Sequence, residues 1–418
     1  MNLDRLRSRA AILLAMLMGS AVQVATAAEF EVLHYFTNDE YAGAMTLLRG
    51  RMAAQGHAWR DFSGQDEHGD PIPLLRKRMA ARDAPAAVQL LPVDAIAEWG
   101  PQAALGNLDG LAKSAGWDRL LPEAVAETLK YRGRYVAVPV HLHRNNRLWT
   151  NTAILARAGV RPPATWEQFF VAAEAIRRVG FVPLAHGAQS WQNLHLLETV
   201  VLGSAGPAFY RRALIELDPA ALASPEMERA LLLLRRLKEY TDTRQPERDW
   251  VTTSNDLIRG RAGMQLMGEW AGPVFADAQA AGRIEYACSA APAAGPGYIF
   301  ALDSFVMLKV APGPAKAQHD FAAALVSPPL QQALNLAKGA LPPWLDADPA
   351  PFGPCVQASM SEYRLAARSG TLVPSMGVGL RPAMVETLAT IVTDFWRDER
   401  IAPHTAIKRM IAAGRRTR

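Results

Sequence analysis

Along the chain, short apolar runs alternate with longer stretches in which apolar residues recur every three or four positions. The short runs predict buried strands at residues 29–36, 57–62, 87–91, 262–270 and 300–310. The longer stretches predict helices at residues 41–54, 71–81, 93–99, 152–158, 165–179, 195–202, 226–241, 254–260, 318–327, 329–338 and 383–398. Strands that alternate with helices, with several chain crossings, predict an α/β fold of two lobes that flank a cleft.

Residues 131–151 have the pattern expected of a connection between two lobes. The β-branched run Val136, Val138 and Val140 is followed by a polar and aromatic stretch, which predicts a buried strand whose far end opens onto a site. Pro139 interrupts the run and has no N–H to donate to a sheet. We therefore expect this strand to lie at a sheet edge or to leave the sheet there, as a hinge.

The N-terminal segment has the features of an export signal. Arg5, Arg7 and Arg9 precede an apolar run at residues 10–24, and small residues follow at 25–27. This order of positive, apolar and small residues is typical of a secretory signal peptide, and the apolar run is short for a membrane span. We expect residues 1–28 to be removed and the mature protein to be soluble in the periplasm.

Length, charge and cysteine content narrow the class of protein. A chain of 418 residues exceeds one ordinary core, so two domains are expected. The formal charge is +5, and residues 1–28 hold three Arg and one Asp, which leaves about +3 and does not favour nucleic-acid binding. Cys288 and Cys355 are expected to form a disulfide in an oxidising compartment, because no His or Cys cluster accompanies them as in a zinc site.

Several stretches together resemble one protein family. The segment GRYVAVPV and the residues that follow it resemble the crossover of extracellular solute-binding proteins of sugar ABC transporters, family 1, and most closely the glucose/mannose-binding branch. Further stretches follow in the family's order, namely PLAHGAQSWQ, RDW, GRAGMQLMGEWA, FALDSFVMLK, NLAKGALP and LVPSM. The resemblance covers the mature chain and implies the two-lobe periplasmic binding protein fold, with a ligand cleft between lobes joined by crossover hinge strands. We assign residues 29–140 and about 299–343 to the N-terminal lobe, and about 141–298 and 344–418 to the C-terminal lobe.

The same resemblance implies a set of ligand-binding residues. The family's first strand ends in two aromatics, which match Tyr35 and Phe36, while its aspartate before SFV matches Asp303 and its K-G lysine matches Lys338. Further candidates at or near cleft-lining positions are His186, Gln189, Trp191, Trp250 and Trp270, and Glu40 is a candidate just after the aromatic pair. Aromatic faces stack on the C–H face of a pyranose, and a carboxylate and a lysine hydrogen-bond its hydroxyls. Trp270 is equally compatible with a core position, and His186 with a structural role.

The chain also departs from the family pattern. Tyr41 stands near the position of a family glutamate, with Glu40 beside it. A lysine is absent at Leu91, and Val378 replaces a histidine. Each buried hydroxyl left unpaired would cost about 1–3 kcal/mol, so we hypothesise that the ligand has shifted or that sugar affinity is weak.

Other polar residues are candidates to compensate for these losses. They include the loop at residues 63–70 together with His141, His143 and Arg144. Arg144 and Arg147 are also compatible with recognition of an acidic sugar, although arginines at a hinge more often form surface ion pairs.

The sequence therefore favours a periplasmic receptor that delivers a monosaccharide to an ABC permease by closing its lobes around it. The alternative is a sensory protein of the same fold that signals to a histidine kinase or chemoreceptor. A glycosidase is disfavoured, because no motif links Asp303 with a second carboxylate such as Asp66, and we predict no enzyme, cofactor or metal. A monomer is expected.

Overall fold

The structure is a computed structural model that describes residues 29–36, 41–62, 71–90, 92–187, 189–242, 248–309 and 315–415. The expected signal peptide, Glu40, Leu91 and the loop at residues 63–70 lie outside these residues. Within them, no helix is both long and apolar enough to cross a bilayer.

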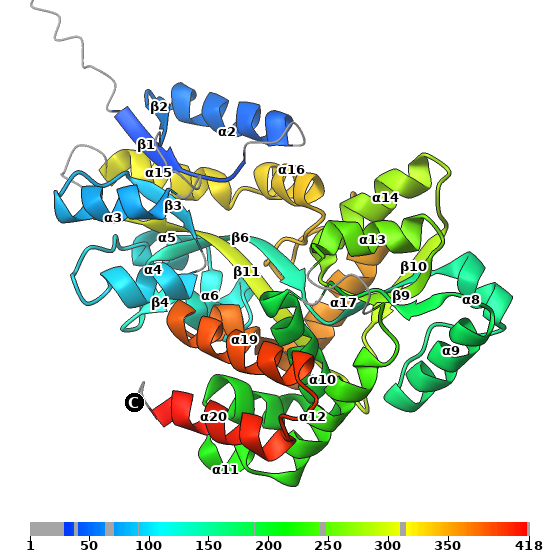
Figure 1. Ribbon diagram of the computed structural model, residues 1–418. Coiled ribbons are helices and arrows are strands. Elements are labelled where there is room, and N and C mark those ends of the chain that lie inside the picture. Colours follow the sequence, from blue (N-terminus) through cyan, green and yellow to red (C-terminus); the bar gives the residue numbers. More distant parts are fainter. Residues whose placement is uncertain are drawn as a thin grey trace, which may run out of the picture.

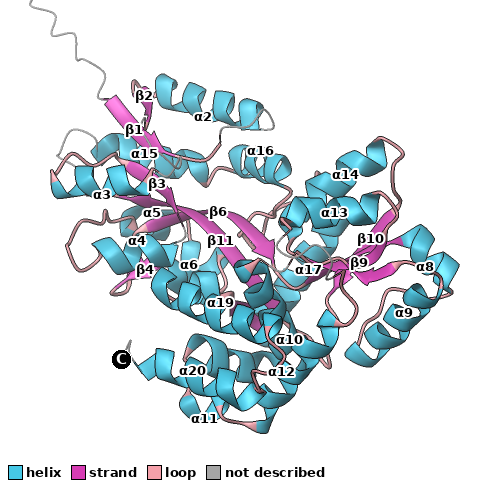
Figure 2. Cartoon of the chain, in the orientation of Figure 1, coloured by secondary structure: helices cyan, strands magenta, loops and turns pink. Residues whose placement is uncertain are grey.

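Two separate sheets carry the fold, with helices packed around each (Figures 1 and 2). The first sheet is mixed and consists of β1 (Glu29–Leu33), β2 (Ala58–Asp61), β3 (Ala87–Leu90), β6 (Ala137–Arg144), β11 (Tyr298–Met307) and β12 (Leu372–Pro374). The second consists of β7 (Arg147–Asn151), β8 (Val182–Leu184), β9 (Ala262–Leu266) and β10 (Tyr286–Ala290). A small hairpin pairs β4 (Lys130–Tyr131) with β5 (Arg134–Tyr135). The α/β class predicted from the sequence is confirmed.

The helices fall into groups around these sheets (Figure 1). Those near the first sheet are α2 (Ala42–Ala54), α3 (Ile72–Ala80), α4 (Pro92–Trp99), α5 (Asp109–Ser114), α6 (Trp117–Leu120), α7 (Glu123–Ala126), the 3₁₀ turn η2 (Glu127–Leu129), α15 (Ala315–Leu325) and α16 (Pro328–Lys338). Those near the second are α8 (Thr152–Ala158), α9 (Trp166–Arg178), α13 (Trp250–Ile258), the 3₁₀ turn η4 (Glu269–Ala271) and α14 (Gly272–Ala280). A helical layer is formed by α10 (Ser190–Tyr210), the π-helical turn η3 (Arg211–Ile215), α11 (Pro219–Leu222), α12 (Pro225–Lys238), α19 (Pro382–Arg397) and α20 (Pro403–Arg415). The helix α17 (Pro354–Ser369) and the short α18 (Met376–Gly379) flank β12.

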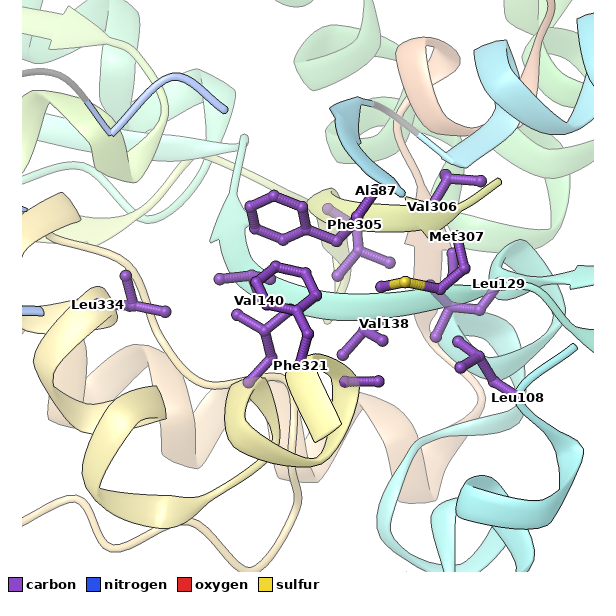
Figure 3. Packing of buried hydrophobic residues seen from close by; sticks show 14 of the residues in the cluster. Ala87, Leu108, Leu129, Val138, Val140, Phe305, Val306, Met307, Phe321 and Leu334 are labelled. Carbon is purple, nitrogen blue, oxygen red and sulfur yellow. The ribbon is translucent and has the colours of Figure 1, made fainter. Parts of the chain in front are cut away.

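Buried apolar side chains form distinct clusters that correspond to the two lobes. The first cluster surrounds β6 and β11, where Val138, Val140 and Phe305 pack against Phe321 of α15 (Figure 3). A second cluster lies among α9, α10, α12 and α19, and a third packs around Trp149 and Phe275 beneath the second sheet. Alternating β-branched residues fill β6 because both of its faces are covered, and all eight of its residues are buried.

Two paired strands run from one sheet into the other. β6 leads through Asn145 and Asn146 into β7, while β10 leads through residues 291–297 into β11. β6 pairs antiparallel with β11 in the first sheet, and β7 pairs antiparallel with β10 in the second. The crossover that the sequence predicts at residues 131–151 is therefore a pair of antiparallel connections between the lobes.

Pro139 lies at a bulge in this crossover. β11 is the strand that β6 pairs with, and the register shifts so that Asp303 faces His141 while Ser304 faces Pro139. The intervening carbonyl of Val140 instead accepts a hydrogen bond from Asn335 Nδ2 of α16 at 3.0 Å. The sheet-edge position predicted for the proline strand is confirmed, and the bulge re-aims His141.

The disulfide predicted from the sequence is present. Cys288 of β10 is bonded to Cys355 of α17, so that the second sheet is linked to a helix beside the crossover. This helix also packs into the first lobe, because its Tyr363 and Met360 belong to the cluster around β6 and β11. The disulfide thus joins the second sheet to a helix that packs on the first apolar cluster.

Some elements differ from the sequence-based prediction. The strand expected at residues 262–270 ends at Leu266, and Trp270 lies in the turn η4. Its ring covers Gly268, where an added Cβ would come within 2.2 Å of the indole. Trp270 is therefore not the last residue of a strand but is held over a glycine, which favours a wall position over a core one.

Candidate functional site

Residues from both lobes meet beside the crossover in a group that we call the interlobe cluster: Phe36, His141, His143, Trp270 and Asp303. His143 Nε2 lies 3.8 Å from Asp303 Oδ2, and the His143 ring lies 5.9 Å from that of Trp270. The ring centroids of Phe36 and His141 are 5.7 Å apart. The cluster thus brings together three of the residues predicted from the sequence, Phe36, Trp270 and Asp303.

The bulge in β6 places two histidines and Asp303 on one face of the first sheet. His141 and His143 are two residues apart, so their side chains project from the same face. Asp303 is the cross-strand neighbour of His141 on β11. Alternate residues of β6, both histidines, thereby lie beside a carboxylate of the neighbouring strand β11, at the point where the lobes meet.

Asp303 carries the charge of the cluster. Burial alone would raise the pKa of its carboxyl, but the hydrogen bond and positive charge of His143, with smaller contributions from His141 and Lys338, lower the pKa to about 2. Its side chain remains 31% exposed, unlike the histidine beside it. Asp303 is therefore an ionised acceptor that a solute can reach.

Two histidines of this region, His141 and His195, are neutral at physiological pH. Burial lowers the pKa of His141 to about 4, despite the opposing effect of the Asp303 charge. Burial also lowers the pKa of His195 on α10 to about 4, and its ring lies 5.7 Å from that of Trp270. Neutral imidazoles offer one donor and one acceptor nitrogen each, which suits hydroxyl groups.

Aromatic rings stand on both sides of the cluster. Phe36 stacks on Tyr41 with ring centroids 4.7 Å apart, and both rings belong to the core of the first lobe. Trp270 lies 6.3 Å from Trp191, whose ring is partly exposed at the start of α10. Each lobe therefore contributes an aromatic pair of the kind that stacks on an apolar ligand face.

Lys338 is held close to the second lobe. It is the last residue of α16, and Gly339 caps this helix in the left-handed conformation with φ of 65°. A Cβ on Gly339 would come within 2.4 Å of Pro273 in α14, so the helix end touches the second lobe. Lys338 also contributes to the lowered pKa of Asp303, which places its charge near the cluster.

The structure places the other predicted site residues elsewhere or at the rim. Tyr35 is 49% exposed, and its backbone N–H donates to Gln89 Oε1. His186 Nε2 is hydrogen-bonded to Asn193 Oδ1 at 2.9 Å, and its ring packs on Trp396. This environment is that of a structural histidine.

Gln189 and Trp250 make contacts outside the interlobe cluster. Gln189 Oε1 accepts a hydrogen bond from Gln192 Nε2 at 2.7 Å just before α10. Trp250 begins α13 and packs on the third apolar cluster, as Trp270 does. Val378 is buried in the core of the first lobe.

A buried ion-pair network lies directly behind the cluster, at the crossover. Arg147 contacts Glu362 of α17 at 3.1 Å and Glu269 at 3.3 Å, and both Arg147 and Glu269 are almost fully buried. Arg144 pairs with Glu362 as well, and its backbone N–H donates to Glu269 Oε2 at 2.7 Å. The expectation that these arginines form surface ion pairs is wrong, because both side chains are buried between α17 and the crossover.

This network also accounts for residues that sequence reasoning missed. Glu269 precedes Trp270, and Arg144 follows His143, so the network fixes the two chain segments that face each other in the cluster. Neither Glu269 nor His195 was singled out from the sequence. A charged residue within the apolar stretch 262–270 was the available signal, because a buried carboxylate needs a specific partner.

The arrangement is that of a binding site. Among the described residues, no group of three or more His, Cys, Asp or Glu side chains is placed to hold a metal ion. An ionised carboxylate, neutral imidazoles, a nearby lysine and aromatic walls can together pair the hydroxyls and cover the faces of a polar ring.

Proteins of known structure share this fold. A chitin oligosaccharide binding protein superposes with a TM-score of 0.76 at 17% identity, covering 93% of this chain and 98% of its own. The bacterial solute receptor AcbH, described as having an exclusive preference for β-D-galactopyranose, superposes with a TM-score of 0.72 at 15% identity, over 93% and 98% of the two chains. Both similarities confirm the two-lobe periplasmic binding protein fold.

Sequence comparison extends the relationship. A probable sugar-binding periplasmic protein of Brucella suis biovar 1 is 35% identical over 402 residues, which cover 95% of each chain. A protein of the same description from Rhizobium meliloti is 35% identical over 96% of each chain. Residues 65–358 match the family described as bacterial extracellular solute-binding protein. The chain belongs to this family of bacterial extracellular solute-binding proteins.

Proposed function

We propose that this protein is the periplasmic sugar-binding component of an ABC transporter and that it binds a monosaccharide at the interlobe cluster. Closure of the two lobes around the sugar would then present it to the permease subunits. The relatives from Brucella suis and Rhizobium meliloti are named as sugar-binding periplasmic proteins, which supports both the ligand class and the compartment. Their names describe sugar binding and lend no support to the sensory alternative.

The observation that carries the proposal is the ionised, reachable carboxylate of Asp303 between aromatic rings of two lobes. A carboxylate accepts hydrogen bonds from two sugar hydroxyls, and such charge-assisted bonds are stronger than neutral ones. Phe36 of the first lobe packs against His141 and Trp270 of the second lobe packs against His143, and these two histidines are the neighbours of Asp303. This combination fits a single pyranose ring, with Lys338 donating to an adjacent oxygen.

The glucose or mannose type of sugar rests on the sequence resemblance. The lobe boundaries proposed from the sequence, at about residues 140, 299 and 343, likewise stay part of the proposal, as does a monomeric state. The first boundary falls within β6, which pairs in the first sheet over its whole length, so we count His141 and His143 with the first lobe. Because the family consists of solute-binding proteins, the prediction that the chain is not an enzyme agrees with its membership.

Replacing Asp303 by Asn tests the proposal. The amide keeps the shape of the side chain but loses the charge, and hydrogen bonds to a charged group are worth about 1.5–3 kcal/mol, so we expect affinity for D-glucose or D-mannose to fall about a hundredfold. Calorimetric titration of the ligand-stripped mature protein measures this. Glu228→Gln, which removes an exposed carboxylate on α12, is the matched control and should bind as the unmodified protein does. Equal affinity of Asp303→Asn and the unmodified protein would place the sugar elsewhere.

A further inference from the structure

We propose that His141 and His195 are ligand-binding residues, one neutral imidazole from each lobe, and that His141 accepts a hydrogen bond from a sugar hydroxyl. The inference rests on the proposed function and specifies which polar groups of the sugar are recognised. Both histidines have a buried Nε2 atom for which the described part of the chain supplies no hydrogen-bond partner. Buried polar atoms in folded proteins are almost always paired, so an unpaired one beside a candidate site indicates a partner supplied by the ligand.

The tautomer of His141 follows from the amide of Asn335. Asn335 Nδ2 donates to the carbonyls of Val140 at 3.0 Å and Gln331 at 2.8 Å, which fixes the amide orientation. Its Oδ1 therefore faces His141 Nδ1 at 3.1 Å, and an oxygen acceptor requires the hydrogen to be on Nδ1. The Nε2 atom of the neutral ring then carries a lone pair, so it can accept but not donate.

The position of His141 places this lone pair at the cluster. His141 faces Asp303 across the strand pair, and its ring lies against Phe36 at 5.7 Å and Tyr41 at 6.3 Å. Asp303 is also an acceptor, so both nearby groups require hydroxyl hydrogens from the ligand. An acidic sugar would bring a negative carboxylate toward these acceptors, while Arg144 and Arg147 are occupied by Glu362 and Glu269.

His195 is the counterpart in the second lobe. It lies on α10, one turn after Trp191, and its ring contacts both Trp191 at 6.5 Å and Trp270 at 5.7 Å. Each lobe thus pairs a neutral histidine with its aromatic wall.

The test uses deoxy and deoxyfluoro analogues of the sugar that binds, D-glucose or D-mannose, at each ring position. Fluorine cannot donate a hydrogen bond, so a hydroxyl that donates to His141 is not replaced by fluorine. At the position whose hydroxyl donates to His141, we expect the deoxy and deoxyfluoro analogues both to bind about tenfold more weakly than the parent sugar. In the His141→Leu variant, the parent sugar and its analogues at that position should bind with equal affinity, while the losses at other positions remain. A double-mutant cycle that combines the protein variant with the sugar analogue measures this difference.

His195→Leu should remove the loss at a different position, and His404→Gln, an exposed histidine on α20, should leave the whole profile unchanged. Deoxyfluoro analogues that bind the unmodified protein as tightly as the parent sugar at every position would overturn acceptance by His141, without need of a variant. An analogue profile that is identical in the unmodified protein and both leucine variants would overturn the assignment of the two histidines. If neither parent sugar binds the unmodified protein, the proposed monosaccharide function fails as well.

Discussion

Replacing Arg147 by Met is expected to destabilise the protein by about 3–5 kcal/mol, because it leaves a buried carboxylate without its partner. Arg147 is 1% exposed and Glu269 is 3% exposed, so neither charge is stabilised by water. Arg147 also donates to the backbone carbonyl of Cys355 at 2.5 Å. Urea unfolding of the mature protein, followed by circular dichroism, measures the change in the free energy of unfolding.

Two further variants separate charge burial from loss of packing. Arg147→Met combined with Glu269→Gln removes both buried charges, and we expect it to recover part of the lost stability. Arg229→Met breaks an exposed ion pair with Glu226 on α12 and should cost less than about 1 kcal/mol. A loss at Arg147 as small as that at Arg229 would mean that the network contributes no more than a surface pair.

The same network has a consequence for ligand binding. Glu269 joins the backbone N–H of Arg144 to the turn that carries Trp270, so the second-lobe wall is attached to the strand that carries His141 and His143. This hydrogen bond therefore fixes the position of Trp270 relative to the end of β6 at His143.

The parts of the fold with strong local signals were predictable from the sequence. The cap at Thr165, whose hydroxyl accepts from the Gln168 N–H at 3.3 Å, marks the start of α9 where the sequence places it. The proline in β6 likewise indicated a strand edge correctly. In both cases the residue affects backbone hydrogen bonds within a few positions of itself, so the local sequence is sufficient to predict the helix start and the strand edge.

Features that depend on distant partners were not predictable in this way. The sequence analysis did not predict helix α17, because the polar Ser359 interrupts the apolar pattern of its buried face. In the structure Ser359 is hydrogen-bonded to the Tyr298 hydroxyl at 2.9 Å. His186 and His141 both follow short apolar runs, yet Nε2 of His186 is bonded to Asn193, while Nε2 of His141 has no hydrogen-bond partner among the described residues. Only the tertiary structure determines which of the two histidines is available to a ligand.

A carboxylic acid buried in the helical layer leads to a pH-dependent stability. Glu198 of α10 is 4% exposed, and its Oε1 accepts from the Tyr210 hydroxyl at 2.6 Å and the Met376 N–H at 2.5 Å. Burial raises its pKa from 4.5 to about 7, although both hydrogen bonds act in the opposite direction. The folded protein therefore retains this proton at pH values at which the unfolded chain has lost it.

The contribution of Glu198 to the free energy of unfolding is fully present below pH 4.5 and is lost as the pH rises through 7. The difference between the pKa of about 7 in the folded protein and 4.5 in the unfolded chain corresponds to about 3 kcal/mol of unfolding free energy. Glu198→Gln stays neutral and keeps an oxygen for both donors, so we expect its stability relative to the unmodified protein to rise by that amount between pH 4.5 and 8. Unfolding free energies across this range measure the difference.

Glu174 provides the matched control, because it also accepts from a tyrosine hydroxyl, that of Tyr240 at 2.7 Å, but lies at the surface of α9. The hydrogen bond from Tyr240 lowers the pKa of Glu174, so Glu174→Gln should show the opposite trend, losing relative stability as the pH rises from acidic values. A Glu198→Gln difference that stays constant from pH 4.5 to 8 would mean that Glu198 ionises at the same pH in the folded protein as in the unfolded chain. Its two hydrogen bonds would then offset burial, and above that pH α10 would contain a buried charge beside Tyr210.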